Sequence, residues 1–246
     1  MKTAFITGAN KSIGLETARQ LAQKGFFVYI GSRDLEKGRA AAVKLAAAGL
    51  TNIGVVRIDV SDPASIAEAG RTLRNRISVL DVLINNAGIR GQGGFQDPLT
   101  VDLAIIREVF ETNFFGVIAV TQTMIDLLRA SPAPRIINVT SGLASLTLHS
   151  DPSWRFAPFK GAAYGPSKTA LNAYTVSLAY ALKDTPFKVN AVDPGYTATD
   201  FNNHRGMGTI EDAASRIVRY ALMGEDGPTG RYFSDDNNPA TGESPW

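Results

Sequence analysis

The 246-residue chain contains no cysteine, which excludes disulfide bonds, thiolate nucleophiles and thiolate-bound metals. Only two histidines are present, His149 and His204, and neither has ligand-like neighbours, so we expect no metal site. The excess of basic over acidic residues is small, 25 against 23, and disfavours nucleic acid or an anionic membrane as a partner. The N-terminus lacks the apolar region of a signal peptide, and no apolar stretch has membrane-spanning length. These absences favour a cytoplasmic globular protein.

Short apolar segments alternate with helical segments along the whole chain, and no linker or repeat divides it. Apolar strands of this kind, separated by helices, indicate a parallel sheet that is covered on both faces. We therefore expect one doubly wound α/β domain over residues 1–246, with about seven strands. The expected strands are residues 4–6, 27–30, 53–58, 79–84, 135–140, 187–192 and 231–233, and the clearest helical segments are 13–24, 101–129, 162–182 and 210–223.

The turn after the first expected strand has the composition of a phosphate-binding turn. Residues 7–14 read Thr-Gly-Ala-Asn-Lys-Ser-Ile-Gly. Glycine permits a tight turn and close approach of the backbone to a pyrophosphate, and the N-terminus of the following helix favours an anion. An ordinary strand–helix turn also contains glycine, so this motif alone leaves that interpretation open.

Several motifs in order resemble the short-chain dehydrogenase/reductase family, and the first turn is most similar to carbonyl-reductase-like members. Asn-Asn-Ala-Gly stands at residues 85–88, Tyr-x-x-x-Lys at 164–168, and Pro-Gly-Tyr-Thr-Ala-Thr at 194–199. The resemblance covers nearly the full length, and the motifs fall at expected strand ends, where open α/β sheets bind ligands. Ser12 departs from the pattern, because the family usually has glycine there. Serine fits if its φ stays negative, and its hydroxyl could then bond a phosphate oxygen.

The resemblance implies a nicotinamide-dependent oxidoreductase with a catalytic set of Asn113, Ser141, Tyr164 and Lys168. Ser141 would stabilise the substrate oxygen, and Asn113 would hold a water in a proton relay to Lys168. The cofactor-binding positions that it implies are Gly8, Asn10, Lys11, Ser12, Ile13, Gly14, Arg33, Asp59, Val60, Asn86, Ala87, Gly88, Tyr164, Lys168, Pro194, Gly195, Thr197 and Thr199.

The end of the second expected strand bears on the choice between NADP(H) and NAD(H). An acidic residue there would bond a free ribose hydroxyl and favour NAD(H). Ser32 and Arg33 stand there instead, and the Arg33 guanidinium suits a 2′-phosphate. Lys11 would supply a second cation, so we expect NADP(H). Asp34 argues the other way, although helix N-capping explains it equally well.

The spacing of Tyr164 and Lys168 has an electrostatic interpretation. Residues four apart share one face of a helix. An ammonium group about 4 Å from a phenolic oxygen contributes about 4 kcal/mol at an effective dielectric constant near 20. That energy would lower the tyrosine pKa by about three units before desolvation opposes it. Tyr164 would then serve as the proton donor when a carbonyl group is reduced.

Two segments lie outside these motifs. Residues 143–161 form an insertion with Trp154, Phe156 and Phe159, for which we expect a place in the substrate-pocket wall or in an interface; a surface loop packed on its own aromatic rings stays an alternative. Residues 196–208 contain few apolar anchors, and we expect a mobile lid over cofactor and substrate.

The function that this sequence favours is reversible, NADPH-dependent reduction of a ketone or aldehyde. The alternative is an NADP-binding regulatory protein without catalysis, because the fold alone does not establish chemistry. The expected partner is a small carbonyl compound, and the oligomeric state stays open, with a homodimer and a homotetramer as the candidates.

Overall fold

The computed structural model describes residues 1–246, which form one parallel sheet of seven strands in the order β3-β2-β1-β4-β5-β6-β7. This confirms the expected doubly wound architecture. Each strand is short and apolar, and β2, β4 and β5 are buried along nearly their whole length. The strands are β1 (Thr3–Ile6), β2 (Phe27–Ser32), β3 (Ile53–Arg57), β4 (Val82–Asn85), β5 (Arg135–Val139), β6 (Lys188–Val192) and β7 (Tyr232–Phe233).

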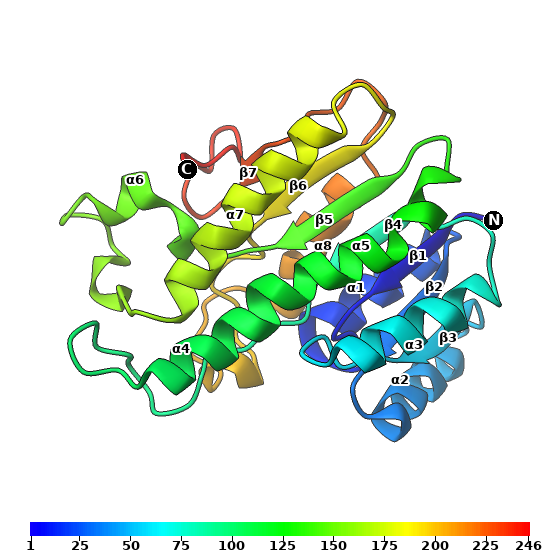
Figure 1. Ribbon diagram of the computed structural model, residues 1–246, viewed down its shortest axis with the longest axis horizontal. Helices are drawn as coiled ribbons and strands as arrows, with labels where there is room; N and C mark the ends of the chain where they lie inside the picture. The colour runs from blue at the N-terminus through cyan, green and yellow to red at the C-terminus, as the bar shows by residue number, and fades with distance from the viewer.

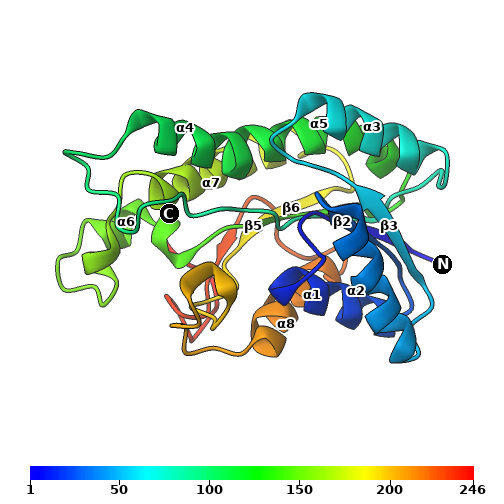
Figure 2. The same cartoon turned by 90° about the horizontal axis from the view of Figure 1, so that it is seen from below.

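Helices cover both faces of the sheet (Figures 1 and 2). On one face α1 (Ser12–Gln23), α2 (Leu35–Ala47) and α8 (Ile210–Ala221) enclose a cluster of 21 buried apolar residues. On the other face α3 (Pro63–Arg74), α5 (Gly116–Arg129) and α7 (Tyr164–Ala181) enclose a second cluster of 18. No helix combines the length and apolarity needed to cross a membrane.

The helical region expected at residues 101–129 is not one regular helix. It consists of α4 (Leu103–Phe110), a π-helical turn η1 (Glu111–Phe115) and α5. At the start of α5, a Cβ atom on Gly116 would collide with the carbonyl oxygen of Val60, so the chain requires glycine there. π-Helical turns are often found at functional sites, and this one carries Asn113.

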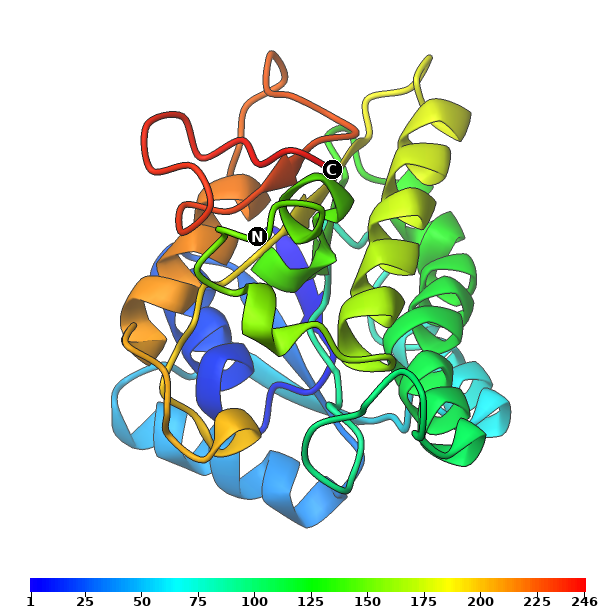
Figure 3. The ribbon, with the colours of Figure 1, turned by 90° about the vertical axis from the view of Figure 1, so that its left-hand side faces the viewer.

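The insertion before α7 is more ordered than an irregular loop. It contains the short helix α6 (Leu146–His149) and two 3-10 turns, η2 (Gly142–Ala144) and η3 (Ala157–Phe159). The 3-10 turn η4 (Asp200–Asn202) lies in the loop after β6. Figure 3 looks onto the end of the molecule where the insertion (green), the loop after β6 (gold) and the C-terminal segment (red) are found.

Candidate active site

A cavity of about 1160 Å³ opens at the carboxyl ends of the strands. The strand order reverses between β1 and β4, and an open α/β sheet binds ligands in the crevice at such a point. Every residue expected to contact the cofactor lines this cavity, and Ser141 does so as well. Asn113 is the one expected site residue that does not, because it is fully buried.

The glycine-containing turn is packed against the segment that follows β4. A Cβ atom on Gly8, which has φ of +63°, would lie 2.9 Å from the Cα of Ala87. A Cβ atom on Gly14 would lie 2.6 Å from the side-chain nitrogen of Asn86. That side chain donates hydrogen bonds to the carbonyl oxygens of Thr7 (2.9 Å) and Gly8 (3.0 Å). Asn86 therefore holds the shape of the turn through its side-chain nitrogen.

Ser12 adopts a φ of +53°, so the expectation that its φ stays negative was wrong. The left-handed region costs an L-residue about 1–2 kcal/mol. The backbone of the turn explains this conformation. Lys11 is extended and helix α1 begins directly at residue 12, so residue 12 has the positive φ that glycine adopts easily. The serine hydroxyl makes no hydrogen bond within the protein that would offset this strain.

We expect Ser12→Gly to stabilise the protein. Glycine adopts positive φ without strain but loses more backbone entropy on folding, so the net gain should be about 0.5–1 kcal/mol in the free energy of unfolding. Urea denaturation measures this gain. Ser12→Ala, which removes the hydroxyl but keeps the strained backbone, is the matched control and should show no gain in stability. Equal effects of the two variants would show that the positive φ of residue 12 does not cost stability.

At the end of β2 an exposed guanidinium lines the cavity without an ion-pair partner. This group belongs to Arg33, whereas Asp34 caps helix α2 by accepting hydrogen bonds from the amides of Glu36 (3.0 Å) and Lys37 (3.1 Å). The capping interpretation of Asp34 therefore fits the structure. Lys11 differs from expectation, since its ammonium nitrogen lies 2.8 Å from the carboxylate of Asp200 across the cavity.

Asn113 joins the π-helical turn to the loop after β4 and to α7. Its oxygen accepts from the Ile89 amide at 2.8 Å, and its nitrogen donates to the Ile89 carbonyl (2.9 Å) and the Ser167 hydroxyl (3.0 Å). A Cβ atom on Gly88 would lie 3.3 Å from the Asn113 oxygen and 3.5 Å from the Lys168 nitrogen. Asn113 thus shapes the wall beside Lys168.

Tyr164 and Ser141 both line the cavity, and the Ser141 hydroxyl acts on the Tyr164 phenol as a hydrogen-bond partner. Burial raises the pKa of the Tyr164 phenol above its ordinary value, the Ser141 hydroxyl lowers it, the charge of Asp193 raises it, and Arg90 lowers it. The Tyr164 ring also packs against Phe201, with 5.3 Å between ring centroids.

The raised pKa of Tyr164 shows that the lowering expected from its spacing to Lys168 was wrong for the protein alone. The Lys168 nitrogen lies 6.0 Å from the centroid of the tyrosine ring. It donates a 2.8 Å hydrogen bond to the carbonyl oxygen of Val139, so it is held by β5. Burial is therefore the largest effect on the pKa of the phenol, and the lysine charge is not among the other effects on it.

Lys168 is buried, and desolvation lowers its pKa from 10.5 to about 8. The folded state consequently binds this proton less tightly than the unfolded state does. Between about pH 8 and pH 10.5 the unfolded chain carries more protons, so this group adds stability as the pH rises. At neutral pH its burial lowers the stability of the fold.

We expect Lys168→Met to change the pH dependence of stability. At 1.36 kcal/mol per pKa unit, the wild type should gain about 3 kcal/mol relative to the variant between pH 7 and pH 10.5. Urea denaturation at both pH values tests this. Lys183→Met, at an exposed lysine, is the control; parallel curves for the wild type and Lys168→Met would show that Lys168 is not desolvated.

Aromatic rings form the wall of the cavity beside Tyr164. Phe156 and Phe159 from the insertion line the cavity. Their ring centroids lie 6.1 and 6.4 Å, respectively, from the ring centroid of Tyr196. Trp154 does not line the cavity, because it packs between His149 and Phe156. The insertion therefore contributes to the pocket wall through its first residue, Leu143, and through its second half.

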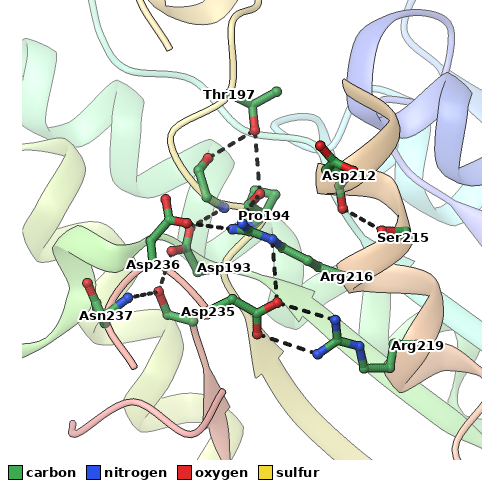
Figure 4. A network of polar contacts seen from close by, with 12 residues as sticks. Asp193, Pro194, Thr197, Asp212, Ser215, Arg216, Arg219, Asp235, Asp236 and Asn237 are labelled. Atoms are coloured by element: carbon green, nitrogen blue, oxygen red, sulfur yellow. Dashed lines mark hydrogen bonds and ion pairs between the residues drawn. The ribbon is translucent and has the colours of Figure 1, made fainter. Parts of the chain in front are cut away.

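Charged side chains of α8 and of the segment after β7 hold the turn after β6 in place (Figure 4). A Cβ atom on Gly195, which has φ of +85°, would collide with the guanidinium of Arg216 from α8. Arg216 forms an ion pair with Asp236 at 2.9 Å, and Asp236 accepts a hydrogen bond from the Tyr196 amide at 3.0 Å. The loop beyond closes on itself through a bridge between Thr197 and Gly208.

Three residues near Tyr164 were missed from the sequence: Phe201, Arg90 and Asp193. Phe201 and Arg90 lie in loops, where no periodic pattern indicates which way a side chain points. Asp193 directly precedes the Pro-Gly turn, and a carboxylate at a strand end was a signal that the sequence contained.

The sheet, its reversal of strand order and the cavity at its carboxyl edge are those of a dinucleotide-binding oxidoreductase. The family model described as "short chain dehydrogenase" matches residues 2–208. The chain belongs to the short-chain dehydrogenase/reductase family.

Individual relatives resemble the chain over most of its length. It is 32% identical to a (+)-neomenthol dehydrogenase from Capsicum annuum, with 94% of each chain covered. It matches the structure of salutaridine reductase from Papaver somniferum with a TM-score of 0.82 at 29% identity, covering 96% of this chain and 100% of the other. A metagenomic short-chain oxidoreductase in complex with NADP matches with a TM-score of 0.74 at 26% identity, covering 93% of each chain.

Proposed function

We propose that this protein catalyses the NADPH-dependent, reversible reduction of a ketone or aldehyde to an alcohol, with Tyr164 as the general acid. One observation carries the proposal: a single cavity has the glycine-containing turn and Arg33 in one part and Tyr164, Ser141 and Lys168 in another. The relatives named above support it, since they are named a dehydrogenase, a reductase and an oxidoreductase in complex with NADP.

The hydrogen-bond donors that line the cavity suit a nicotinamide dinucleotide. The turn at Gly8 places backbone amides before the N-terminus of α1, which suits a pyrophosphate. Arg33 lines the cavity and has no ion-pair partner within the protein, so its guanidinium is available to a 2′-phosphate. Asp59, whose carboxylate accepts hydrogen bonds from Ser61, would border the adenine together with Val60.

The proposed chemistry requires two transfers to the carbonyl group. NADPH, when bound, supplies the hydride that reaches the carbon. The Tyr164 phenol donates its proton to the oxygen, and the Ser141 hydroxyl stabilises the charge that develops there. Lys168 keeps a positive charge beside the phenol, which favours the phenolate that remains after the proton has left.

Arg33 and Lys11 have different parts in this proposal. Arg33 would recognise the 2′-phosphate directly. Lys11 pairs with Asp200 of the expected lid, so it must exchange that carboxylate for the phosphate or link the lid to the turn. An exposed ion pair of this kind adds little stability, so a phosphate can displace it.

The test is a binding titration followed by a turnover assay. We expect NADPH to bind and to be consumed in the presence of apolar and aromatic ketones, since phenylalanine and tyrosine rings form the wall. Tight NADPH binding with no turnover across a broad panel of ketones and aldehydes would favour the alternative, a cofactor-binding regulatory protein.

A further inference from the structure

A buried carboxylate lines the cavity of the proposed active site and has no part in the chemistry described above. Asp193 follows β6, and only 5% of its surface is exposed. It forms no ion pair. Arg216, which lies in the same polar network, directs its guanidinium to Asp235 (3.6 Å) and Asp236 (2.9 Å) instead (Figure 4). A buried carboxylate without a counter-ion costs stability, so its presence calls for a role.

The carboxylate of Asp193 joins three segments that follow three different strands. One oxygen accepts a 3.0 Å hydrogen bond from the Gly195 amide, after β6. The other accepts a 2.6 Å hydrogen bond from the Ser234 hydroxyl, after β7. The amide of Gly142, after β5, faces the second oxygen, and a Cβ atom there would lie only 3.2 Å from it.

Two of these segments belong to the proposed active site. Gly142 directly follows Ser141, and Gly195 belongs to the turn expected to hold the nicotinamide. The C-terminal segment adds two bonds to the first of them, because the Tyr232 hydroxyl donates to the Ser141 carbonyl at 2.7 Å and Asn237 donates to the Gly142 carbonyl at 3.3 Å. Ser141 and Gly142 are thus held by groups that follow β6, lie in β7 and follow β7.

We propose that Asp193 is a positioning residue whose carboxylate fixes Gly142 and Gly195 relative to each other, and so places the Ser141 hydroxyl against the nicotinamide-binding turn. Its effect on turnover rests on the proposed function, whereas its effect on the two glycine amides does not. The geometry supports this role because one oxygen of Asp193 accepts from the Gly195 amide at 3.0 Å, while the other lies against Gly142, where a Cβ atom would be 3.2 Å away.

The charge of Asp193 also acts on the groups packed around it. It raises the pKa of Tyr164 on α7 and of Tyr232 on β7, in both cases after the larger effect of burial. Burial raises the pKa of Asp193 itself, its hydrogen bonds with Ser234, Gly195 and Gly142 lower it, and the nearby Asp236 raises it. The cations near Tyr164 are Lys168, whose nitrogen lies 6.0 Å from the ring centroid, and Arg90, which lowers the tyrosine pKa.

The experiment compares Asp193→Asn with Asp193→Ala. Asparagine keeps one oxygen for the Gly195 amide but turns a donor toward the Gly142 amide, whereas alanine removes both acceptors. In the protein without cofactor, hydrogen exchange at Gly142 should be roughly tenfold faster in Asp193→Asn, the equivalent of one hydrogen bond, with Gly195 unchanged. Both amides should exchange faster in Asp193→Ala.

The activity measurements separate positioning from general support of the fold. For Asp193→Asn we expect kcat to fall roughly tenfold to hundredfold while the dissociation constant of NADPH stays within about threefold. In alcohol oxidation, which requires the Tyr164 phenolate, the rise in kcat/KM with pH should move to lower pH, because the charge of Asp193 raises the pKa of Tyr164.

The matched control is Asp81→Asn. Asp81 is a buried carboxylate near the other end of the sheet, bound by the Thr3 amide (2.7 Å) and the Ser131 hydroxyl (2.7 Å). This variant should lose stability without moving the Gly142 exchange rate or the pH midpoint.

Wild-type exchange at Gly142 in a folded Asp193→Asn protein would overturn the proposal, as would an unchanged pH midpoint. If neither Asp193 variant folds, Ser234→Ala, which keeps the charge but removes the 2.6 Å bond, must still speed exchange at Gly142. Absence of turnover in the wild type would refute the proposed function alone, because the exchange result would still decide the positioning role.

Discussion

Replacing Tyr164 by phenylalanine should reduce turnover about a thousandfold while NADPH binding stays within about threefold. A positioned proton donor contributes about 10²–10⁴-fold to a rate, and the hydroxyl is the only group that this substitution removes. The ring keeps its packing against Phe201. Steady-state assays with a ketone substrate and a fluorescence titration with NADPH measure the two effects.

Tyr174→Phe is the control for this substitution. Tyr174 lies on the same helix, α7, but it does not line the cavity, and its hydroxyl interacts with Thr121. Its loss should leave turnover nearly unchanged. If Tyr164→Phe retained wild-type turnover, Tyr164 would not be the proton donor, and a water molecule or another group would have to supply the proton.

Removing the Arg33 guanidinium should weaken NADPH binding about 10–100-fold and leave NADH binding unchanged. A hydrogen bond to a charged group contributes about 1.5–3 kcal/mol, and NADH lacks the phosphate that would receive it. The change is Arg33→Ala, measured by titration with each cofactor. We expect a smaller effect from Lys11→Met, because its ammonium is shared with Asp200.

Arg39→Ala provides the comparison for charge. Arg39 lies on the next helix, α2, pairs with Glu36 at 2.7 Å and does not line the cavity. Equal weakening of NADPH and NADH by Arg33→Ala would mean that Arg33 acts on a part common to both cofactors, and the expected preference for NADP(H) would be wrong.

The alternation of short apolar segments and helices was sufficient to predict the sheet. Each strand is buried by helices on both faces, so its residues are almost all apolar and stand out from their surroundings. The π-helical turn at Asn113 was not foreseen, because its hydrophobic periodicity is close to that of the α-helices on each side. A tertiary contact, the close approach of Gly116 to Val60, lies directly after it.

The cofactor-binding part of the site was easier to predict than the chemistry of its groups. Motifs at strand ends specify which backbone lines the crevice, and all of those positions line the cavity. The pKa of Tyr164 depends instead on how deeply the phenol is buried and on Asp193, 29 residues away in sequence. Such effects need coordinates, since helix spacing gives only the neighbour on the same element.

The positive φ of Ser12 has a similar origin. The sequence showed that serine stood in a glycine position, but only the structure showed that the backbone kept the glycine conformation. The serine therefore adapts to the turn at a cost in free energy, and the turn does not adapt to the serine.

The most direct test of the central claim is transfer of a label from cofactor to substrate. The wild type is incubated with an aromatic ketone and NADPH that carries deuterium at the transferable C4 position, and the alcohol is analysed by mass spectrometry. We expect the alcohol to gain one deuterium at the former carbonyl carbon, and Tyr164→Phe to form little of it. Alcohol without deuterium at that carbon, or no alcohol from any ketone while NADPH is bound, would contradict the account.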